Sequence, residues 1–137
     1  MCALKAAGLR LTRQRLEIIR EIAGAVDHPD ADVIFHRVRE RVPTISPDTV
    51  YRTLDVLARR GLVERIPMPR ATRFDPDLSP HHHFVCDRCG RLVDVRTDVI
   101  SPVPAPPTVL DGIGDVHSVH LQMWGTCKTC MEQGSLC

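Results

Sequence analysis

The stretch SPDTVYRTLDVLARRG, residues 46–61, decides the N-terminal fold of this 137-residue chain. Ser46 is a good N-cap residue, and Pro47 suits the first helical position, where the missing backbone N–H costs nothing. Val50, Leu54 and Leu57 recur at helical spacing and predict one buried face, and the helix should end at Gly61.

Two further amphipathic helices are expected before this segment. The first runs from Thr12, a candidate N-cap, to Gly24, and the second follows His28-Pro29, is capped by Asp30 and ends by Pro43. Their predicted core residues are Leu16, Ile19, Ile22 and Ala23 in the first helix, and Val33, Ile34 and Val38 in the second.

Two short β-like segments, residues 62–66 and 72–74, flank a turn-forming stretch that contains Pro67 and Pro69. Three helices followed by a small hairpin is the order of a winged helix-turn-helix, a fold that places its third helix in the major groove of double-stranded DNA. The sequence therefore predicts an N-terminal winged-helix domain over residues 1–75.

The outward face of the third helix presents candidate DNA contacts. Thr49, Tyr51 and Arg52 lie there; Tyr51 can touch a thymine methyl, and Arg52 can donate to guanine or to phosphate. Arg10 and Arg13 can hold phosphates or enter a minor groove. The alternative is an ordinary solvated helix face, because most arginine-rich faces bind nothing.

The charge distribution separates the chain into two parts. The net charge is +1, but residues 1–75 contain 14 Lys and Arg against 10 Asp and Glu, whereas residues 76–137 contain 4 against 7. The second part also holds five of the seven His and five of the six Cys. A basic part and an acidic, His/Cys-rich part suggest separate functions.

Two C-x-x-C pairs lie 37 residues apart in the second part, and their cysteines are Cys86, Cys89, Cys127 and Cys130. Two such pairs supply the four thiolates of a tetrahedral structural zinc site. The alternative, two redox disulfides, is disfavoured because neither pair is expected to begin a helix. Cys2 and Cys137 are interpreted as free thiols.

The run His81-His82-His83 precedes Cys86 on a predicted strand. Alternation places His81 and His83 on one face and His82 on the other. Residues 91–96 should form a neighbouring strand that contributes Asp94, and Asp75 lies just upstream. Two imidazoles and two carboxylates suit Fe²⁺, Mn²⁺ or Zn²⁺, although a His run can also be an accident of the surface.

Together, residues 45–54, Thr72-Arg73-Phe74-Asp75 and the His81–Gly90 stretch resemble the ferric uptake regulator family. The resemblance covers about residues 8–131. It implies an α+β homodimer, in which a winged-helix domain precedes a small α/β dimerisation domain (residues 76–137) with a four-cysteine zinc site. It also implies a metal-dependent repressor rather than an enzyme, which binds a DNA operator.

The resemblance assigns structural Zn²⁺ to the four cysteines of the two pairs. It assigns a regulatory Fe²⁺ or Mn²⁺ to His28, Asp75, His81, His83 and Asp94, and the metal would tie the two domains in one orientation. Asp at both carboxylate positions is similar to the peroxide-responsive members, in which peroxide oxidises a ligand histidine, here His28 or His81. The alternatives are an iron-responsive regulator without peroxide sensing and, in another class, a zinc-dependent enzyme.

The segment between the cysteine pairs departs from the family resemblance, which implies a helix there. Residues 101–107 are proline-rich, so only a short helix is expected, near residues 108–113, followed by a strand over residues 116–124.

No apolar run is long enough to cross a membrane and no apolar leader precedes residue 20, so a cytoplasmic protein is expected.

Overall fold

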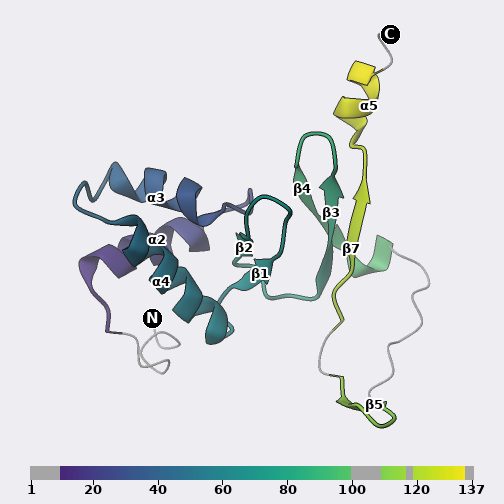
Figure 1. Cartoon of the computed structure of the whole chain (residues 1–137), viewed down its shortest axis with the longest axis horizontal. Coiled ribbons are helices and arrows are strands. Elements are labelled where there is room, and N and C mark those ends of the chain that lie inside the picture. The colour runs from purple at the N-terminus through teal and green to yellow at the C-terminus, as the bar shows by residue number, and fades with distance from the viewer. Residues whose placement is uncertain (1–9, 100–108, 117–118, 135–137) are drawn as a thin grey trace. The chain divides into compact units, whose positions relative to one another are not determined.

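The computed structural model describes residues 10–99, 109–116 and 119–134, and the chain divides into two compact units, residues 1–78 and 79–137. In the described part, the first unit combines helices with a two-stranded sheet, and the second combines a three-stranded sheet with a small hairpin and a short helix (Figure 1). The α+β class expected from the sequence is confirmed.

Within residues 10–78, each helix of the first unit begins at the predicted cap. The helices are α2 (Arg13–Ala23), α3 (Ala31–Arg39) and α4 (Pro47–Arg59). The side-chain oxygens of Thr12, Asp30 and Ser46 accept backbone N–H groups three residues later, at 3.3, 2.8 and 3.2 Å respectively. These bonds satisfy donors that a helix start otherwise leaves without an intrahelical partner.

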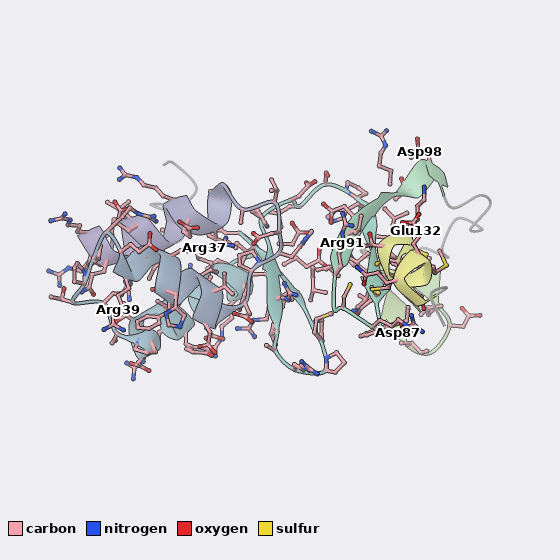
Figure 2. All side chains as sticks on the ribbon, turned by 90° about the horizontal axis from the view of Figure 1, so that it is seen from above. Arg37, Arg39, Asp87, Arg91, Asp98 and Glu132 are labelled. Atoms are coloured by element: carbon pink, nitrogen blue, oxygen red, sulfur yellow. The ribbon has the colours of Figure 1, made fainter. Side chains whose placement is uncertain are left out.

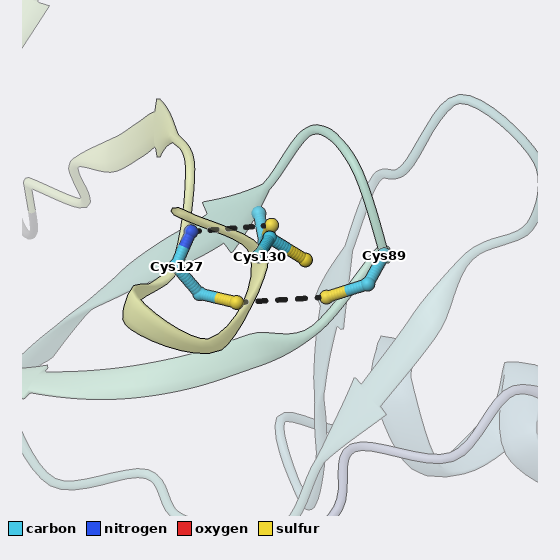
Figure 3. Close-up of side chains that lie close together, drawn as sticks. Cys89, Cys127 and Cys130 are labelled. Atoms are coloured by element: carbon cyan, nitrogen blue, oxygen red, sulfur yellow. Dashed lines mark hydrogen bonds between the residues drawn. The ribbon is translucent and has the colours of Figure 1, made fainter. Parts of the chain in front are cut away.

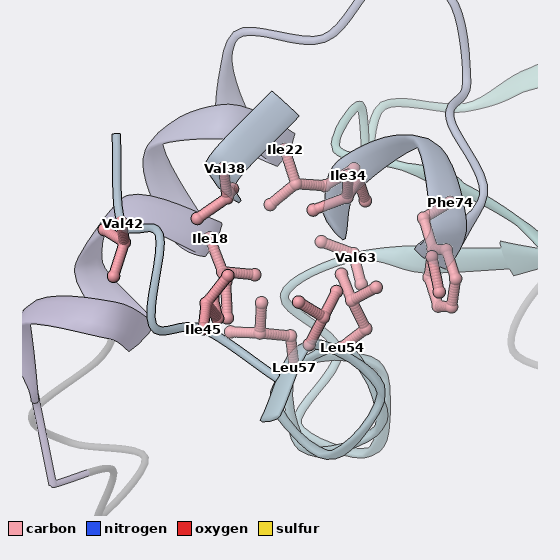
Figure 4. Close-up of a cluster of buried hydrophobic side chains, with 12 residues drawn as sticks. Ile18, Ile22, Ile34, Val38, Val42, Ile45, Leu54, Leu57, Val63 and Phe74 are labelled. Carbon is pink, nitrogen blue, oxygen red and sulfur yellow. The ribbon is translucent and has the colours of Figure 1, made fainter. Parts of the chain in front are cut away.

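The core of the first unit lies between the three helices (Figure 4). Val50, Leu54 and Leu57 are buried, as their spacing predicted. The predicted face of α2 was partly wrong, because Ile18 is fully buried, whereas Ala23 is exposed. Compared with the prediction, α2 is turned about its axis, so that Ile18 and Ile22, which are four residues apart, point inward together.

The predicted hairpin is present as β1 (Glu64–Ile66) and β2 (Arg73–Asp75), which pair antiparallel. The loop before α3 is also bound to β2: the Phe74 N–H donates to the Pro29 carbonyl at 3.1 Å, and Asp30 forms an isolated bridge with Arg73. Phe74 is buried in the helical core. The hairpin and the start of α3 therefore form one structure around Asp75.

The second unit is built on β3 (His81–Cys86), which lies between β4 (Leu92–Arg96) and β7 (Gln122–Gly125). β4 runs antiparallel and β7 parallel to β3. His83 is paired with Asp94 on one side and with Gln122 on the other. A 3₁₀ turn, η1 (Thr97–Val99), follows β4, and α5 (Lys128–Gly134) follows β7.

The segment between the cysteine pairs differs from its prediction. The expected helix near residues 108–113 is wrong: β5 (Val109–Leu110) and β6 (Gly114–Asp115) form a hairpin, in which the Ile113 N–H donates to the Leu110 carbonyl at 3.0 Å. Gly112 has φ +72°, a left-handed conformation that favours this turn over a helix.

The strand expected over residues 116–124 is also shorter than predicted, because β7 begins only at Gln122. The proline-rich residues 101–107 and residues 117–118 lie outside the described residues.

Charged side chains cover the outside of each unit, as Arg37 and Arg39 illustrate on α3 and Asp87 and Glu132 near the cysteine pairs (Figure 2). Within the described ranges, none of the helices has the length and apolar character needed to cross a membrane.

Candidate metal centres and DNA-binding face

The four cysteines of the two C-x-x-C pairs meet at one end of the three-stranded sheet. Cys86 ends β3, Cys89 follows in a turn, Cys127 directly precedes α5, and Cys130 lies in the first turn of α5. Their four Sγ atoms all lie within 4.8 Å of one another (Figure 3). The Gly90 N–H closes the first turn on the Cys86 carbonyl at 2.9 Å, and Gly90 has the left-handed φ of +71°.

The spacing of the sulfur atoms fits a tetrahedral metal site. Zinc–sulfur bonds of about 2.3 Å in a tetrahedron separate neighbouring sulfurs by about 3.8 Å. The Sγ atoms of Cys89 and Cys127 lie 3.8 Å apart, and all four thiols are free. A disulfide would require a separation of about 2 Å.

The protonation of the cluster is uneven. The backbone N–H of Cys127, which donates to the Cys86 Sγ at 3.3 Å, and then that of Cys89, lower the pKa of Cys86 to about 6. Hydrogen bonds to Cys127 and Cys89 raise the pKa of Cys130 to about 12. The Cys86 thiol therefore ionises more readily than the Cys130 thiol, and a metal bound by all four sulfurs would have to displace the Cys130 proton.

The expectation that neither cysteine pair begins a helix is wrong for the second pair. The Cys127 carbonyl accepts the Met131 N–H at 2.9 Å in the first turn of α5. What disfavours two separate disulfides is instead the convergence of both pairs on one point.

A second group of ligand atoms lies on the other half of β3 and on β4. The Nε2 atoms of His81 and His83 are 3.0 Å apart, and the Asp94 Oδ1 lies 3.6 and 3.5 Å from them. Two ligand atoms about 2.1 Å from one ion are about 3.0 to 3.4 Å apart, for octahedral or tetrahedral angles. The triangle therefore has nearly the size that a single metal ion requires.

The tautomer of His81 is set by the backbone. Its Nδ1 lies 2.7 Å from the Ser79 carbonyl oxygen, which can only accept, so Nδ1 donates the proton and the neutral ring has its lone pair on Nε2. A backbone carbonyl behind the imidazole is the usual support of a metal-binding histidine. His82 points to the opposite face, as predicted, and its Nδ1 accepts the Leu121 N–H at 3.2 Å.

In the first unit, His28 and Asp75 form a buried pair, with 3.4 Å between His28 Nε2 and Asp75 Oδ2. The Asp77 N–H holds the other carboxylate oxygen at 2.8 Å. His28 has φ +49°, which is unfavourable for a residue with a side chain. Arg73 stabilises this conformation by donating to the His28 carbonyl at 2.9 Å.

The candidate DNA contacts on α4 are exposed or half-buried. Arg52 is bound to Asp48 at 2.9 Å, and the Thr49 hydroxyl lies 2.9 Å from that of Ser46. Tyr51 is 51% exposed, and its hydroxyl donates to Asp32 at 3.2 Å. Arg10 and Arg13, before and at the start of α2, are both exposed.

Residue types and spacing alone do not identify three features of these sites. At His28 these patterns indicate only a loop, and it is the family resemblance that assigns this residue to the regulatory site. The patterns also do not predict that the Ser79 carbonyl accepts from His81 or that Asp32 accepts from Tyr51. The dipeptide His28-Pro29 was the available signal, because a residue before proline is conformationally restricted.

The fold and the ligand groups define a small α+β protein with side chains suited to metal ions. The model of the ferric uptake regulator family matches residues 6–113, and the chain belongs to this family.

Similar proteins include the peroxide-responsive repressor PerR of Staphylococcus epidermidis, 31% identical over 136 residues that cover 98% of this chain and 90% of the relative. The solved ferric uptake regulator of Vibrio cholerae has a TM-score of 0.71 and 26% identity, and the match covers 92% of this chain and 98% of that one. The structure of PerR from Streptococcus pyogenes has a TM-score of 0.51 and 27% identity, and the match covers 93% and 88%.

Proposed function

We propose that this chain is a cytoplasmic, homodimeric, metal-dependent transcriptional repressor that senses peroxide, and that it is not an enzyme. Residues 1–75 are the winged-helix DNA-binding domain, and residues 76–137 are the metal-binding dimerisation domain. Family membership and the three capped helices followed by a hairpin support the DNA-binding part. Thr49, Tyr51 and Arg52 would enter the major groove, and Arg10 and Arg13 would bind phosphates.

Zn²⁺ is the proposed structural metal at Cys86, Cys89, Cys127 and Cys130. The 3.8 Å separation of two of the sulfurs and the all-thiol ligand set support this choice. The metal would join the end of β3 to α5 and so keep the strand that contains His81 and His83 in register.

The proposed regulatory site combines the two His/Asp groups, namely His28 with Asp75 and His81 with His83 and Asp94. Each group alone offers two or three ligands, which leaves coordination positions of Fe²⁺ or Mn²⁺ open. A shared ion would hold the two domains in one orientation, and the two recognition helices of a dimer could then fit successive major grooves.

The assignment to peroxide rests on one observation, the aspartates Asp75 and Asp94 beside the ligand imidazoles in a chain that is 31% identical to a PerR. Bound Fe²⁺ would supply the electron that lets peroxide oxidise an adjacent imidazole. His28 and His81 are the candidate targets. An oxidised ring binds the metal poorly, so the orientation of the domains, and with it DNA binding, would be lost.

The test compares the protein loaded with Fe²⁺ and with Mn²⁺ before and after peroxide. Operator duplexes are first selected from a randomised pool with the Mn²⁺ form. We expect peroxide to release DNA from the Fe²⁺ form, to add one oxygen atom to a peptide containing His28 or His81, and to leave the Mn²⁺ form bound. Full DNA affinity and unmodified histidines in the Fe²⁺ form would refute peroxide sensing.

An iron-responsive repressor is the second candidate, and it predicts DNA binding that follows the Fe²⁺ concentration and ignores peroxide. A metalloenzyme is the candidate from another class. Two histidines and one carboxylate around an ion also occur in iron oxygenases, and zinc hydrolases need similar ligands. Substrate turnover by the metal-loaded protein, without affinity for any duplex, would favour an enzyme.

A further inference from the structure

Tyr51 of α4 contacts a residue of α3 that no DNA-binding pattern singled out. Its hydroxyl donates to the Asp32 Oδ1 at 3.2 Å, and the two residues belong to different helices of the same unit. Asp32 lies in the first turn of α3, where a carboxylate interacts favourably with the helix dipole, so its own position is stabilised.

The ring of Tyr51 borders open space. It lines a hollow of about 610 Å³ between α3, α4 and the β1–β2 hairpin, and the charged groups around this hollow are Asp30, Asp32, Arg52, Asp55, Arg65 and Arg70. A ring that is 51% exposed and borders a hollow is not held by close packing alone. The hydrogen bond to Asp32 is therefore the directional contact that fixes its orientation.

The hydrogen bond to Asp32 limits which contacts Tyr51 can make with DNA bases. A carboxylate only accepts, so the proton of the hydroxyl is committed to Asp32, and the hydroxyl oxygen can only accept from DNA. Burial, followed by the negative charge of Asp32 and the hydrogen bond to it, raises the pKa of Tyr51. The ring edge and face remain available for apolar contact, and thymine is the base that presents a methyl group in the major groove.

We infer that Asp32 is a positioning residue for DNA specificity, which holds the ring of Tyr51 in the orientation that contacts a thymine methyl. This inference rests on the proposed DNA-binding function. Asp32 itself touches no base in this arrangement, and its effect reaches DNA through Tyr51.

The contact itself can be tested without DNA, because Tyr51 is the single tyrosine of the chain. The phenolate absorbance of the full chain then titrates this residue alone. We expect Asp32→Ala to lower the pKa of Tyr51, and Asp48→Ala, which removes the same charge from the exposed start of α4, to change it less. An unchanged Tyr51 titration in Asp32→Ala would overturn the inference.

The specificity is tested on a duplex selected from a random pool by the Mn²⁺-loaded full chain. Each thymine is replaced in turn by 2′-deoxyuridine, which lacks the methyl group. Loss of one buried methyl group costs about fourfold in affinity. The thymine that contacts Tyr51 is the one whose replacement weakens binding by the natural chain but not by Tyr51→Ala. At that position, we expect the ratio of the affinities for the thymine and deoxyuridine duplexes to fall from about four toward one in Asp32→Ala.

Two further variants separate positioning from charge. Asp32→Asn removes the charge but retains a carbonyl acceptor, so we expect it to keep most of the thymine preference. Asp48→Ala should change overall affinity and retain the preference.

A full fourfold preference in Asp32→Ala, or the absence of any thymine that depends on Tyr51, would overturn the inference while leaving DNA binding intact. Failure of the metal-loaded chain to select any duplex would instead refute the proposed function, and this inference with it.

Discussion

Loss of the thiolate cluster should unfold the second unit and leave the first one folded. In the described part of the second unit, Val85 and Leu92 are the buried aliphatic side chains, and Cys86 and Cys130 are also buried. Burial of two such side chains contributes about 3 to 6 kcal/mol. Structural zinc contributes about 10 to 16 kcal/mol in small domains at neutral pH. The proposed metal therefore stabilises this unit more than its apolar core does, and Cys86→Ser should abolish its cooperative folding.

The first unit has a separate hydrophobic cluster of twelve buried residues and should survive. The chain offers a reporter for each unit. Its single tryptophan, Trp124, lies in β7, whereas the long helices α2, α3 and α4 belong to the first unit and dominate the circular dichroism at 222 nm. In Cys86→Ser we expect the Trp124 emission of an unfolded chain and a retained helical transition.

The matched control is Cys2→Ser, because Cys2 belongs to neither C-x-x-C pair. It should behave like the natural chain in both measurements, and a strong zinc chelator should reproduce the effect of Cys86→Ser. A folded Trp124 signal and an unchanged thermal transition in Cys86→Ser would refute the reasoning, as would simultaneous loss of the helical transition.

Four further outcomes are expected. His83→Ala should lower Mn²⁺ affinity at least tenfold in calorimetric titration, since it removes one vertex of the ligand triangle. His28→Asn should also weaken Mn²⁺ binding. Asn tolerates the left-handed conformation, so the expected loss of about 1 to 3 kcal/mol in unfolding free energy comes from the missing contact with buried Asp75. Leu54→Ala should destabilise the first unit by about 2 to 5 kcal/mol in urea, and a smaller loss would show that the core collapses around the cavity. The hydrogen bond from Arg37 holds the pKa of Asp27 below its usual 3.8. The ion pair therefore stabilises the folded state fully above pH 3.8, and this stabilisation is lost as the pH falls through the lowered pKa. Asp27→Asn should therefore cost up to about 1 kcal/mol at pH 7, and the difference should vanish in acid.

Local signals accounted for much of the architecture. N-caps act within four residues, helical and alternating periodicities act within one element, and a C-x-x-C pair forms its own turn. For this reason Thr12, Asp30 and Ser46 begin their helices as predicted, and His82 points away from the side of β3 that His81 and His83 share. The family resemblance extended these signals to His28, which no local pattern identified.

The errors lie where neighbours in space outweigh neighbours in sequence. Residues 109–115 form a hairpin because a left-handed glycine allows the turn, and β7 is limited to the residues that pair with β3. Helix α5 was missed because only seven residues form it, too few for a clear periodicity.

The sequence alone determined the class of the chain, the caps of its helices and most of the candidate ligand side chains, since these follow from residue type and short-range spacing. The tertiary structure decided how the ligands are presented. Contacts between residues far apart in the chain hold His28 in a left-handed conformation, bring the Sγ atom of Cys89 to 3.8 Å from that of Cys127, and place Asp32 beside Tyr51. Such contacts depend on packing between elements, which no local pattern of residues encodes.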